Sequence, residues 1–162
     1  MKSLLMKSRF YAYQVLFIGM LSLSLNNKAD AQSVDETTFS KVNLYADVGA
    51  HFGYQASINF ERQIYSGKKL TWYARGGLGA SGVIMTTGGP GGLAAITMLT
   101  GKKNKHFEIN AGTFVGKDIE LDKMYVLPLI DFGYRYQKPE GGLIFKAKVG
   151  FLGLGIGLGY AF

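Results

Sequence analysis

A repeat of two residues is clearest in the last segment of the chain, residues 142–162, which read GLIFKAKVGFLGLGIGLGYAF. Apolar residues alternate first with Lys146 and Lys148 and then with glycine. Successive side chains of a β-strand point to opposite faces, so this period indicates strands rather than helices. Residues 142–151 and 153–162 are therefore predicted to form two antiparallel strands joined by a tight turn.

The same alternation recurs along the rest of the chain after residue 41. Strands are predicted at about residues 42–50, 55–65, 69–80, 92–100, 105–116, 124–137, 142–151 and 153–162. The segment 92–100 is apolar on both phases, so its two faces stay unassigned. Eight strands of this length use up most of the chain, which favours an all-β, eight-stranded antiparallel up-and-down transmembrane barrel.

Two kinds of connection alternate between the predicted strands. Residues 66–69, 101–105 and 137–142 are short, charged and turn-forming, whereas the other connections are neutral or rich in glycine. The longest of these, residues 82–91, is predicted to be a flexible loop. In an even-stranded outer-membrane barrel with both termini in the periplasm, the charged turns are periplasmic and the other four are extracellular.

The beginning of the chain has the pattern of a secretory signal. Lys2, Lys7 and Arg9 precede an apolar run at residues 15–25, and residues 29–31 (ADA) place small side chains where a signal peptidase cleaves. The apolar run is too short for a membrane-spanning helix. The predicted organisation is a signal at 1–31, a short periplasmic lead-in at 32–41 and the barrel at 42–162.

Charges within the predicted strands fall almost entirely on one phase. That phase carries Asp47, Glu61, Arg75, Glu108, Asp131, Arg135, Lys146 and Lys148. The other phase carries bulky aliphatic and aromatic residues, which the narrow lumen of an eight-stranded barrel cannot hold. We therefore expect a polar, charge-paired interior, an apolar lipid-facing outside and no open pore. Neighbouring strands offer the pairs Glu61–Arg75, Glu108–Arg135 and Asp131–Lys146.

Aromatic residues on the apolar phase cluster at the strand ends expected to face the periplasm. They are Trp72, Phe107, Tyr134, Tyr136, Phe145, Tyr160 and Phe162. Rings at one height around a barrel are typical of an interfacial aromatic girdle. Arg62 also falls on the apolar phase, but close enough to a strand end for its head group to reach water.

The end of the chain resembles the terminal strand of bacterial outer-membrane barrels, in its alternation and its final phenylalanine (GLGYAF, 157–162). Residues 60–62, 112–114 and 132–136 also resemble strand cores of small OmpA-like and OmpX-like barrels. The resemblance implies that Leu158, Tyr160 and Phe162 are read by the barrel-assembly machinery. It further implies an outer-membrane monomer in contact with lipids and lipopolysaccharide, and it carries over no catalytic residues.

Composition narrows the remaining functions. The chain has no cysteine, which excludes disulfides, thiolate metal sites and cysteine nucleophiles. Its net charge of +7 comes partly from the leader, and its lysines cluster in turns, so nucleic-acid binding is not expected. We expect no cofactor and no bound metal. The glycine run at 88–92 lacks the remainder of a phosphate-binding loop.

The leading hypothesis is a non-enzymatic barrel with a structural or surface-interaction role. A narrow channel for ions or small solutes is the second and a soluble periplasmic binder the last. A lipid-modifying enzyme would need a histidine, a serine and an acid together. The candidates are His51, His106, Ser57, Ser81, Asp118 and Glu120. An alternative interpretation of Asp118, Glu120 and Asp122 is a site that attracts a divalent cation.

Overall fold

The computed structural model of the chain describes residues 39–67, 69–84, 87–101 and 103–162. The predicted secretory signal at 1–31 lies outside these residues. The strands are β1 Val42–Ala50, β2 Gly53–Ser66, β3 Leu70–Val83, β4 Thr87–Thr100, β5 Lys105–Lys117, β6 Met124–Gln137, β7 Gly142–Gly150 and β8 Gly153–Ala161. The described part of the chain holds no helix that is long and apolar enough to cross a membrane.

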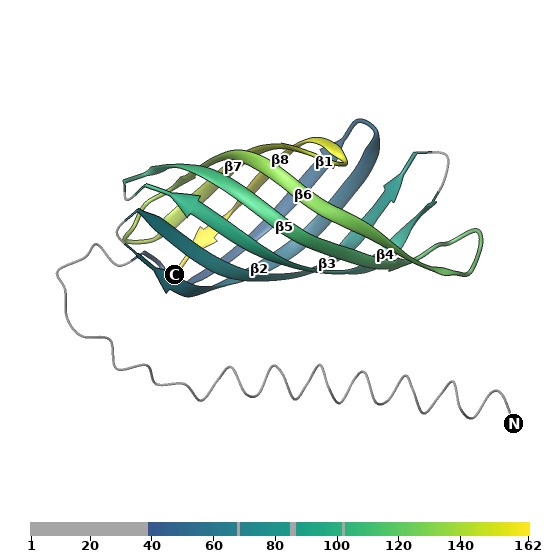
Figure 1. Cartoon of the computed structure of the whole chain (residues 1–162), viewed down its shortest axis with the longest axis horizontal. Coiled ribbons are helices and arrows are strands. Elements are labelled where there is room, and N and C mark those ends of the chain that lie inside the picture. The colour runs from purple at the N-terminus through teal and green to yellow at the C-terminus, as the bar shows by residue number, and fades with distance from the viewer. Residues whose placement is uncertain (1–38, 68, 85–86, 102) are drawn as a thin grey trace, which may run out of the picture. The chain divides into compact units, whose positions relative to one another are not determined.

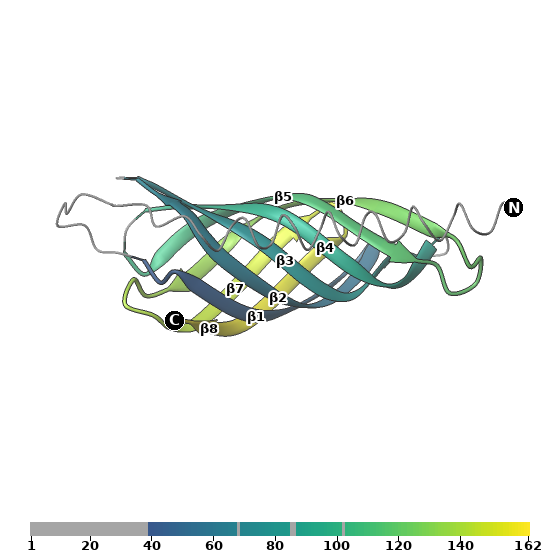
Figure 2. The same ribbon diagram turned by 90° about the horizontal axis from the view of Figure 1, so that it is seen from below.

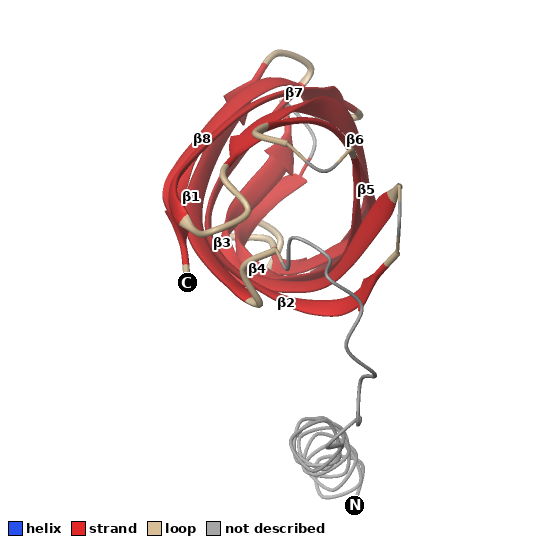
Figure 3. Ribbon diagram, turned by 90° about the vertical axis from the view of Figure 1, so that its left-hand side faces the viewer, coloured by secondary structure: helices blue, strands red, loops and turns tan. Residues whose placement is uncertain are grey.

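The eight strands form one closed barrel, in which each strand pairs antiparallel with its neighbours in the chain (Figures 1 and 3). β1 and β8 close the barrel, with a register that runs from Asn43 opposite Ala161 to Ala50 opposite Leu154. The predicted eight-stranded up-and-down architecture is confirmed. A closed barrel leaves no free sheet edge around its waist, where every strand has two partners.

The two ends of the barrel differ in the connections they carry. The start of β1 and the end of β8 lie together with the β2–β3, β4–β5 and β6–β7 turns, and we call this the basal end (Figure 2). The other four connections lie at the opposite end, which we call the distal end. Both sets of connections are short.

Side chains alternate between the lumen and the outside along the strands. In β1, Asn43 and Asp47 are fully buried, whereas Leu44 and Val48 are 47% and 52% exposed. Exposed aliphatic and aromatic side chains recur on the outer face of every strand. An apolar outside around a polar inside is the polarity of a barrel that faces lipid, and the reverse of a soluble barrel.

β4, whose faces the sequence did not assign, follows the same rule. Leu93, Thr97 and Leu99 are buried in the lumen, whereas Ile96 is 40% exposed on the outside. Only Thr97 of these lumenal residues is polar. The faces could not be read from the sequence because the lumenal phase of β4 is nearly as apolar as its outer phase.

The prediction of a long flexible loop at residues 82–91 is wrong, because β3 extends to Val83 and β4 begins at Thr87. The glycines of this region mark close packing. A Cβ on Gly89 would lie 2.0 Å from the carbonyl oxygen of Lys117, and one on Gly91 would lie 2.2 Å from that of Val115. Glycine in a strand can thus signal the close approach of a neighbouring backbone as well as a turn.

The distal rim is uneven, because β2 to β6 are 13 or 14 residues long whereas β1, β7 and β8 have only 9. The distal ends of β3 to β6 therefore extend beyond the β7–β8 turn (Figure 1). β6 pairs with β7 only from Asp131 onward, so residues 124–130 of β6 have a ladder partner on the β5 side alone.

Inward-facing glycines of β8 leave room for the larger side chains of β1. An added Cβ on Gly159 would lie 2.2 Å from Cβ of Tyr45, and one on Gly157 would lie 2.1 Å from Oδ1 of Asp47. Because β8 presents no side chains to the lumen at these positions, the side chains of Tyr45 and Asp47 occupy the space beside it. Gly76 is the contrasting case, because an added Cβ there would meet nothing within 4 Å.

The Gly159→Val variant should lower the free energy of unfolding by about 1–3 kcal/mol, because the new side chain overlaps Tyr45. Gly76→Val is the matched control and should change stability by less than about 0.5 kcal/mol. Urea unfolding of both variants in lipid vesicles measures the difference. Equal effects at the two positions would contradict the assignment of Gly159 to the filled lumen.

Candidate functional site

The interior of the barrel is filled by side chains in three layers. A basal lid closes one mouth, a network of charged side chains occupies the middle, and an apolar cluster occupies one side of the distal half. Figure 3, which views the barrel from its basal side, shows the ring of strands that encloses these layers. Arg135, Tyr45, Tyr73, Phe114 and Lys146 are among the largest fully buried side chains.

The basal lid consists of Phe39 and Ser40, the described residues that precede Lys41. Phe39 is 1% exposed, and its ring lies 5.0 Å from that of His106 on β5. The backbone amide of Ser40 donates to the carbonyl oxygen of Pro139 at 3.0 Å, and the hydroxyl of Tyr73 donates to that of Ser40 at 3.2 Å. The end of the predicted lead-in therefore packs into the mouth of the barrel.

The charged network is centred on Glu61 of β2, which is fully buried. Arg135 of β6 donates to both of its carboxylate oxygens, from Nη1 at 2.8 Å and from Nη2 at 2.9 Å. Asn43, Tyr45 and Thr97 also donate to this carboxylate. Glu61 thus forms a bidentate ion pair with the guanidinium of Arg135 and accepts further hydrogen bonds from neutral donors. These interactions offset the cost of removing its carboxylate from water.

Arg135 also binds a second carboxylate, that of Glu108 on β5, with Nε 2.5 Å from Oε2. Lys146 of β7 approaches the other oxygen of Glu108, with Nζ 2.7 Å from Oε1. Both bases and Glu108 are almost fully buried. Three strands, β5 to β7, are therefore joined to β2 by a single chain of ion pairs.

Asp47 of β1 is the second centre of the network. Nη2 of Arg75 lies 2.8 Å from Oδ2 of Asp47, and Nζ of Lys148 lies 3.1 Å from the same atom. Lys148 also contacts Gln55 at 3.2 Å and Asp131 at 3.5 Å. The network thus contains all eight charged residues predicted for the interior, and each is less than 9% exposed.

Two of the three predicted pairings were wrong. The pair of Glu108 and Arg135 is present, so that prediction is confirmed. Glu61 and Arg75 stand opposite each other in the β2–β3 register, but Arg75 pairs with Asp47 instead. Register alone did not determine which partner each lumenal charge takes.

The prediction that Asp131 pairs with Lys146 was also wrong, because Asp131 lies closest to Lys148 at 3.5 Å. The predicted pairs were limited to neighbouring strands. The lumen of an eight-stranded barrel is narrow enough for side chains to meet across it. Glu61 and Arg135 do so from strands that do not pair with each other.

The ring of Tyr45 lies among the charges of the network. Three cations approach it, with Lys146 Nζ 4.0 Å, Arg75 Cζ 5.4 Å and Arg135 Cζ 5.5 Å from the ring centroid. Its hydroxyl donates to Glu61. An aromatic face attracts cations while its hydroxyl binds an anion, so Tyr45 contacts both signs of charge at once.

One side of the distal half of the lumen, along β4 to β6, is apolar, whereas Gln55 and Ser81 keep the side of β2 and β3 polar. The apolar side was not predicted from the sequence. Its members are Leu93, Ala95, Phe114, Leu127, Leu129 and Leu152, with Val83 and Tyr125 packed against them. Most of these residues lie on the inward phase of their strands, but the inward phase was recognised by its charged residues, and these segments carry no lumenal charge. An inward apolar residue can be recognised in the sequence only by counting in steps of two from a charged inward residue of the same strand.

Asp118, which follows β5, links the β5–β6 loop to β4 by hydrogen bonds. Its carboxylate accepts the amides of Gly88 at 3.0 Å, Glu120 at 2.9 Å and Leu121 at 2.8 Å. Hydrogen bonds from the amides of Leu121, Gly88 and Glu120 hold the pKa of the Asp118 carboxyl below its ordinary value of 3.8. Nearby, the hydroxyl of Tyr125 donates to the carbonyl oxygens of Ser81 and Gly89.

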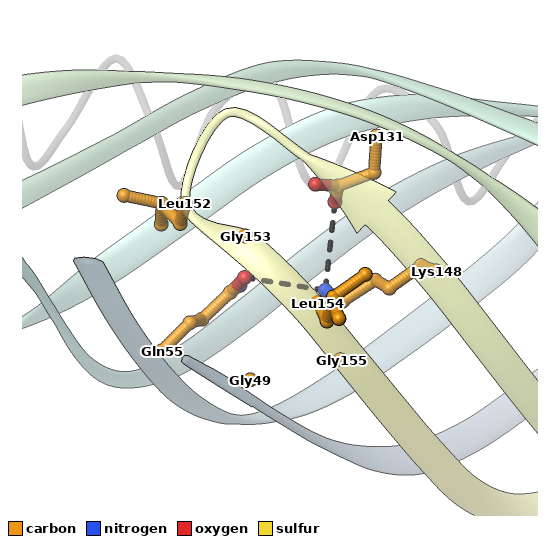
Figure 4. A pocket seen from close by; sticks show the side chains of 8 residues that line it. All are labelled: Gly49, Gln55, Asp131, Lys148, Leu152, Gly153, Leu154 and Gly155. Carbon is orange, nitrogen blue, oxygen red and sulfur yellow. Dashed lines mark hydrogen bonds and ion pairs between the residues drawn. The ribbon is translucent and has the colours of Figure 1, made fainter. Parts of the chain in front are cut away.

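A small cavity lies between the charged network and the distal rim (Figure 4). Gln55, Asp131 and Lys148 line it together with Leu152 and several glycines, and its volume is about 10 Å³. Lys148 points toward both Gln55 and Asp131 in this view. The space admits about one water molecule and is too small for an organic solute.

The candidate catalytic residues do not form a hydrogen-bonded set among the described residues. His51 is exposed in the β1–β2 turn, beside Phe52, whereas His106 belongs to the basal end. Ser57 contacts Asn59, and Ser81 donates to the backbone of β2 at 3.1 Å. Among the described residues, no hydrogen bond joins either histidine to either serine.

The acidic residues of the β5–β6 connection do not converge on a common point. Asp118 binds backbone amides, Asp122 forms an exposed ion pair with Lys117, and Glu120 is exposed. Within the described residues, no group of three or more histidine, cysteine, aspartate or glutamate side chains is arranged to hold a metal ion.

The aromatic residues predicted as a girdle lie on the outer face near the basal end. Phe107 stands opposite Tyr134, and Tyr136 stands opposite Phe145. Tyr65 was not predicted as part of the girdle, but it is 60% exposed and stands opposite Trp72. A register shift between Gln63 and Tyr65 reverses the phase of β2 there and turns Tyr65 outward. We call these residues, with Tyr160 and Phe162, the basal aromatic band.

Comparison with known proteins gives no relative. No protein-family model matches the chain, and neither does any curated protein or any solved structure. The function of the protein is therefore inferred from the geometry of its barrel.

The Arg135→Leu variant should lower the free energy of unfolding by about 3–5 kcal/mol, because it leaves two buried carboxylates without their guanidinium. Arg75→Leu should also destabilise the barrel, since Asp47 keeps only its lysines. Arg62→Leu, on the outer face, is the control and should cost less than about 1 kcal/mol. Comparable effects of all three in urea unfolding would mean that the two faces are assigned the wrong way round.

The Asp118→Asn variant should speed hydrogen exchange at the amides of Gly88, Glu120 and Leu121 relative to their intrinsic rates. The folded pKa of Asp118 lies below that of the unfolded chain. Its stabilisation is therefore complete above about pH 4 and declines as the pH falls through the folded pKa. Glu120→Gln is the control and should leave these amides protected. Unchanged protection in Asp118→Asn would refute the role of its carboxylate.

Proposed function

We propose that the protein is an integral outer-membrane barrel of the bacterial cell envelope, with a closed lumen and a structural or surface-interaction role. The observation that carries this proposal is the combination of an apolar outer face with a lumen filled by paired charges. Buried ion pairs are costly without good partners, so the network suits a permanently filled interior.

The orientation in the membrane follows from the two ends. Outer-membrane barrels with an even number of strands keep both termini in the periplasm. The basal end would then be periplasmic, with the basal aromatic band at the inner interface. The final strand, through Leu158, Tyr160 and Phe162, would carry the assembly signal. Outer-membrane lipids and lipopolysaccharide would be the surrounding partners of a monomeric barrel.

The surface-interaction part of the proposal is supported by the uneven distal rim. Apolar side chains are exposed on its higher side, namely Ile84, Ile119, Leu121 and Met124, at 51% to 75% exposure. The connection that carries Ile119 and Leu121 is anchored to β4 by Asp118. A contact surface at this rim would therefore be ordered before any partner arrives, which lowers the entropic cost of binding.

A narrow ion channel is the second candidate, favoured by the polar residues that continue from Asn43 to Gln55 and by the small cavity beside Lys148. Two features weigh against it. Phe39 and His106 occupy the basal mouth, and the apolar cluster occupies one side of the distal half. A lipid-modifying enzyme remains a third candidate, and an altered lipid A profile on expression would support it.

Two measurements test the proposal. Unboiled protein should migrate differently from boiled protein in gel electrophoresis, because a closed barrel resists detergent until it is heated. Reconstituted into planar bilayers, the protein should give no conductance steps above the lipid background. Absence of a heat-dependent shift would reject the membrane barrel, whereas regular conductance steps would favour the channel.

A further inference from the structure

The exposed basic residues of the barrel are concentrated at its basal end. They are Lys41, Arg62, Lys69, Lys103, Lys105 and Lys138. We call them the basal basic rim. Glu140 is the one exposed acidic residue among the described residues of this end. Two more lysines, Lys68 and Lys102, adjoin the rim in sequence but lie outside the described residues.

The other charges of the described chain nearly cancel. The lumen holds four acidic and four basic residues, which pair with one another. The distal rim has Lys117 and Lys123 against Asp118, Glu120 and Asp122. The positive charge of the described barrel therefore lies almost entirely at its basal end.

The basal basic rim has no use within the described barrel. No ion pair joins any of its six members to an acidic side chain of the described residues. Like charges crowded around one rim repel one another, so the arrangement costs stability unless an anion lies nearby. A partner outside the barrel is therefore the natural counterpart of these cations.

The height of the rim suggests what that partner is. Lys105 stands opposite Tyr136 in the β5–β6 ladder and is two residues basal to Phe107. Lys69 is three residues basal to Trp72 on the same side of the barrel. Lys69 thus lies just beyond the basal aromatic band, and Lys105 lies level with Tyr136 at its basal edge. Arg62 lies on the membrane side of Tyr65, from where its long side chain can extend toward the edge. Rings of such a band sit at the edge of the hydrocarbon, and flexible lysines beyond it reach the phosphate layer.

We propose that the basal basic rim binds the head groups of anionic phospholipids in the leaflet that surrounds the basal end. The inference rests on the proposed function, since it requires the barrel to span a bilayer. Each basic residue near an anionic surface adds attraction equivalent to about a fivefold change in binding constant. The sector of Arg62, Lys69 and Lys103 holds three such residues.

This sector is suited to measurement because it surrounds the single tryptophan of the chain, Trp72. Arg62 stands opposite Ala74, two residues along β3 from Trp72. The backbone amide of Gly101 donates to the carbonyl oxygen of Lys69 at 3.0 Å, which brings the turn that carries Lys103 beside Lys69. A quencher on a lipid bound at this sector therefore lies near the indole.

The test measures quenching of Trp72 in vesicles that mix phosphatidylcholine with brominated phosphatidylglycerol, and in vesicles with the bromine on the phosphatidylcholine instead. The wild-type protein should prefer phosphatidylglycerol by at least about fivefold at low ionic strength, which is the attraction that one of the three basic residues supplies. The preference should fall toward onefold in 0.5 M NaCl, because exposed charges are screened.

Two variants separate this rim from the rest of the surface. The triple variant Arg62→Gln, Lys69→Gln, Lys103→Gln should lose the preference, whereas Lys117→Gln, Lys123→Gln at the distal rim should keep it. Equal quenching by both lipids in the wild type would overturn the inference, as would equal loss in both variants.

The heat-dependent gel shift, measured in pure phosphatidylcholine vesicles and in the mixed vesicles, distinguishes the lipid site from the membrane barrel on which it rests. Insertion and a heat shift in pure phosphatidylcholine, with no lipid preference in mixtures, would leave the membrane barrel standing and remove the lipid site. Failure to insert into either kind of vesicle would remove both.

Discussion

The contact between Arg135 and Glu61 is the one on which the rest of the lumen depends. A buried guanidinium or carboxylate costs several kcal/mol in lost hydration, and only close pairing offsets that cost. Arg135 meets two carboxylates, one of them across the barrel from a strand that does not pair with its own. The charges are therefore held in place only when the barrel is closed, and closure and charge neutralisation are parts of one event.

Glycines on the lumenal face of β8 leave the space that this network occupies. Inward glycines of β8 lie against Tyr45 and Asp47, and Tyr45 in turn lies among three cations. Because β8 contributes glycines to the lumen, the large lumenal side chains of its neighbours β1 and β7 have space beside it. Long side chains such as Arg135 consequently fill the lumen by extending across it. The surroundings of each charge therefore include residues of strands that are not its neighbours.

The fold and the polarity of the barrel followed from the period of two and from the phase of the charges. The eight interior charges were found in this way, since a charge on the lipid side would have been too costly to expect. Their partners were not predicted, because only neighbouring strands were compared. Glu61 and Arg135 lie on strands that do not pair, and their side chains meet across the lumen. Tyr65 was missed because a bulge reverses the phase, and residues 82–91 because glycine also marks tight packing.

The open portion of β6 has a consequence for how two copies of this chain can meet. The carbonyl of Ile130 accepts the amide of Phe151, so residues of its phase present their backbone polar groups to the open side. Pro128 has that phase, and it offers no hydrogen there. A strand arriving from a second copy would leave one of its own carbonyls without a hydrogen-bond donor from β6. The chain thus discourages edge-to-edge growth at the place where its sheet is incomplete.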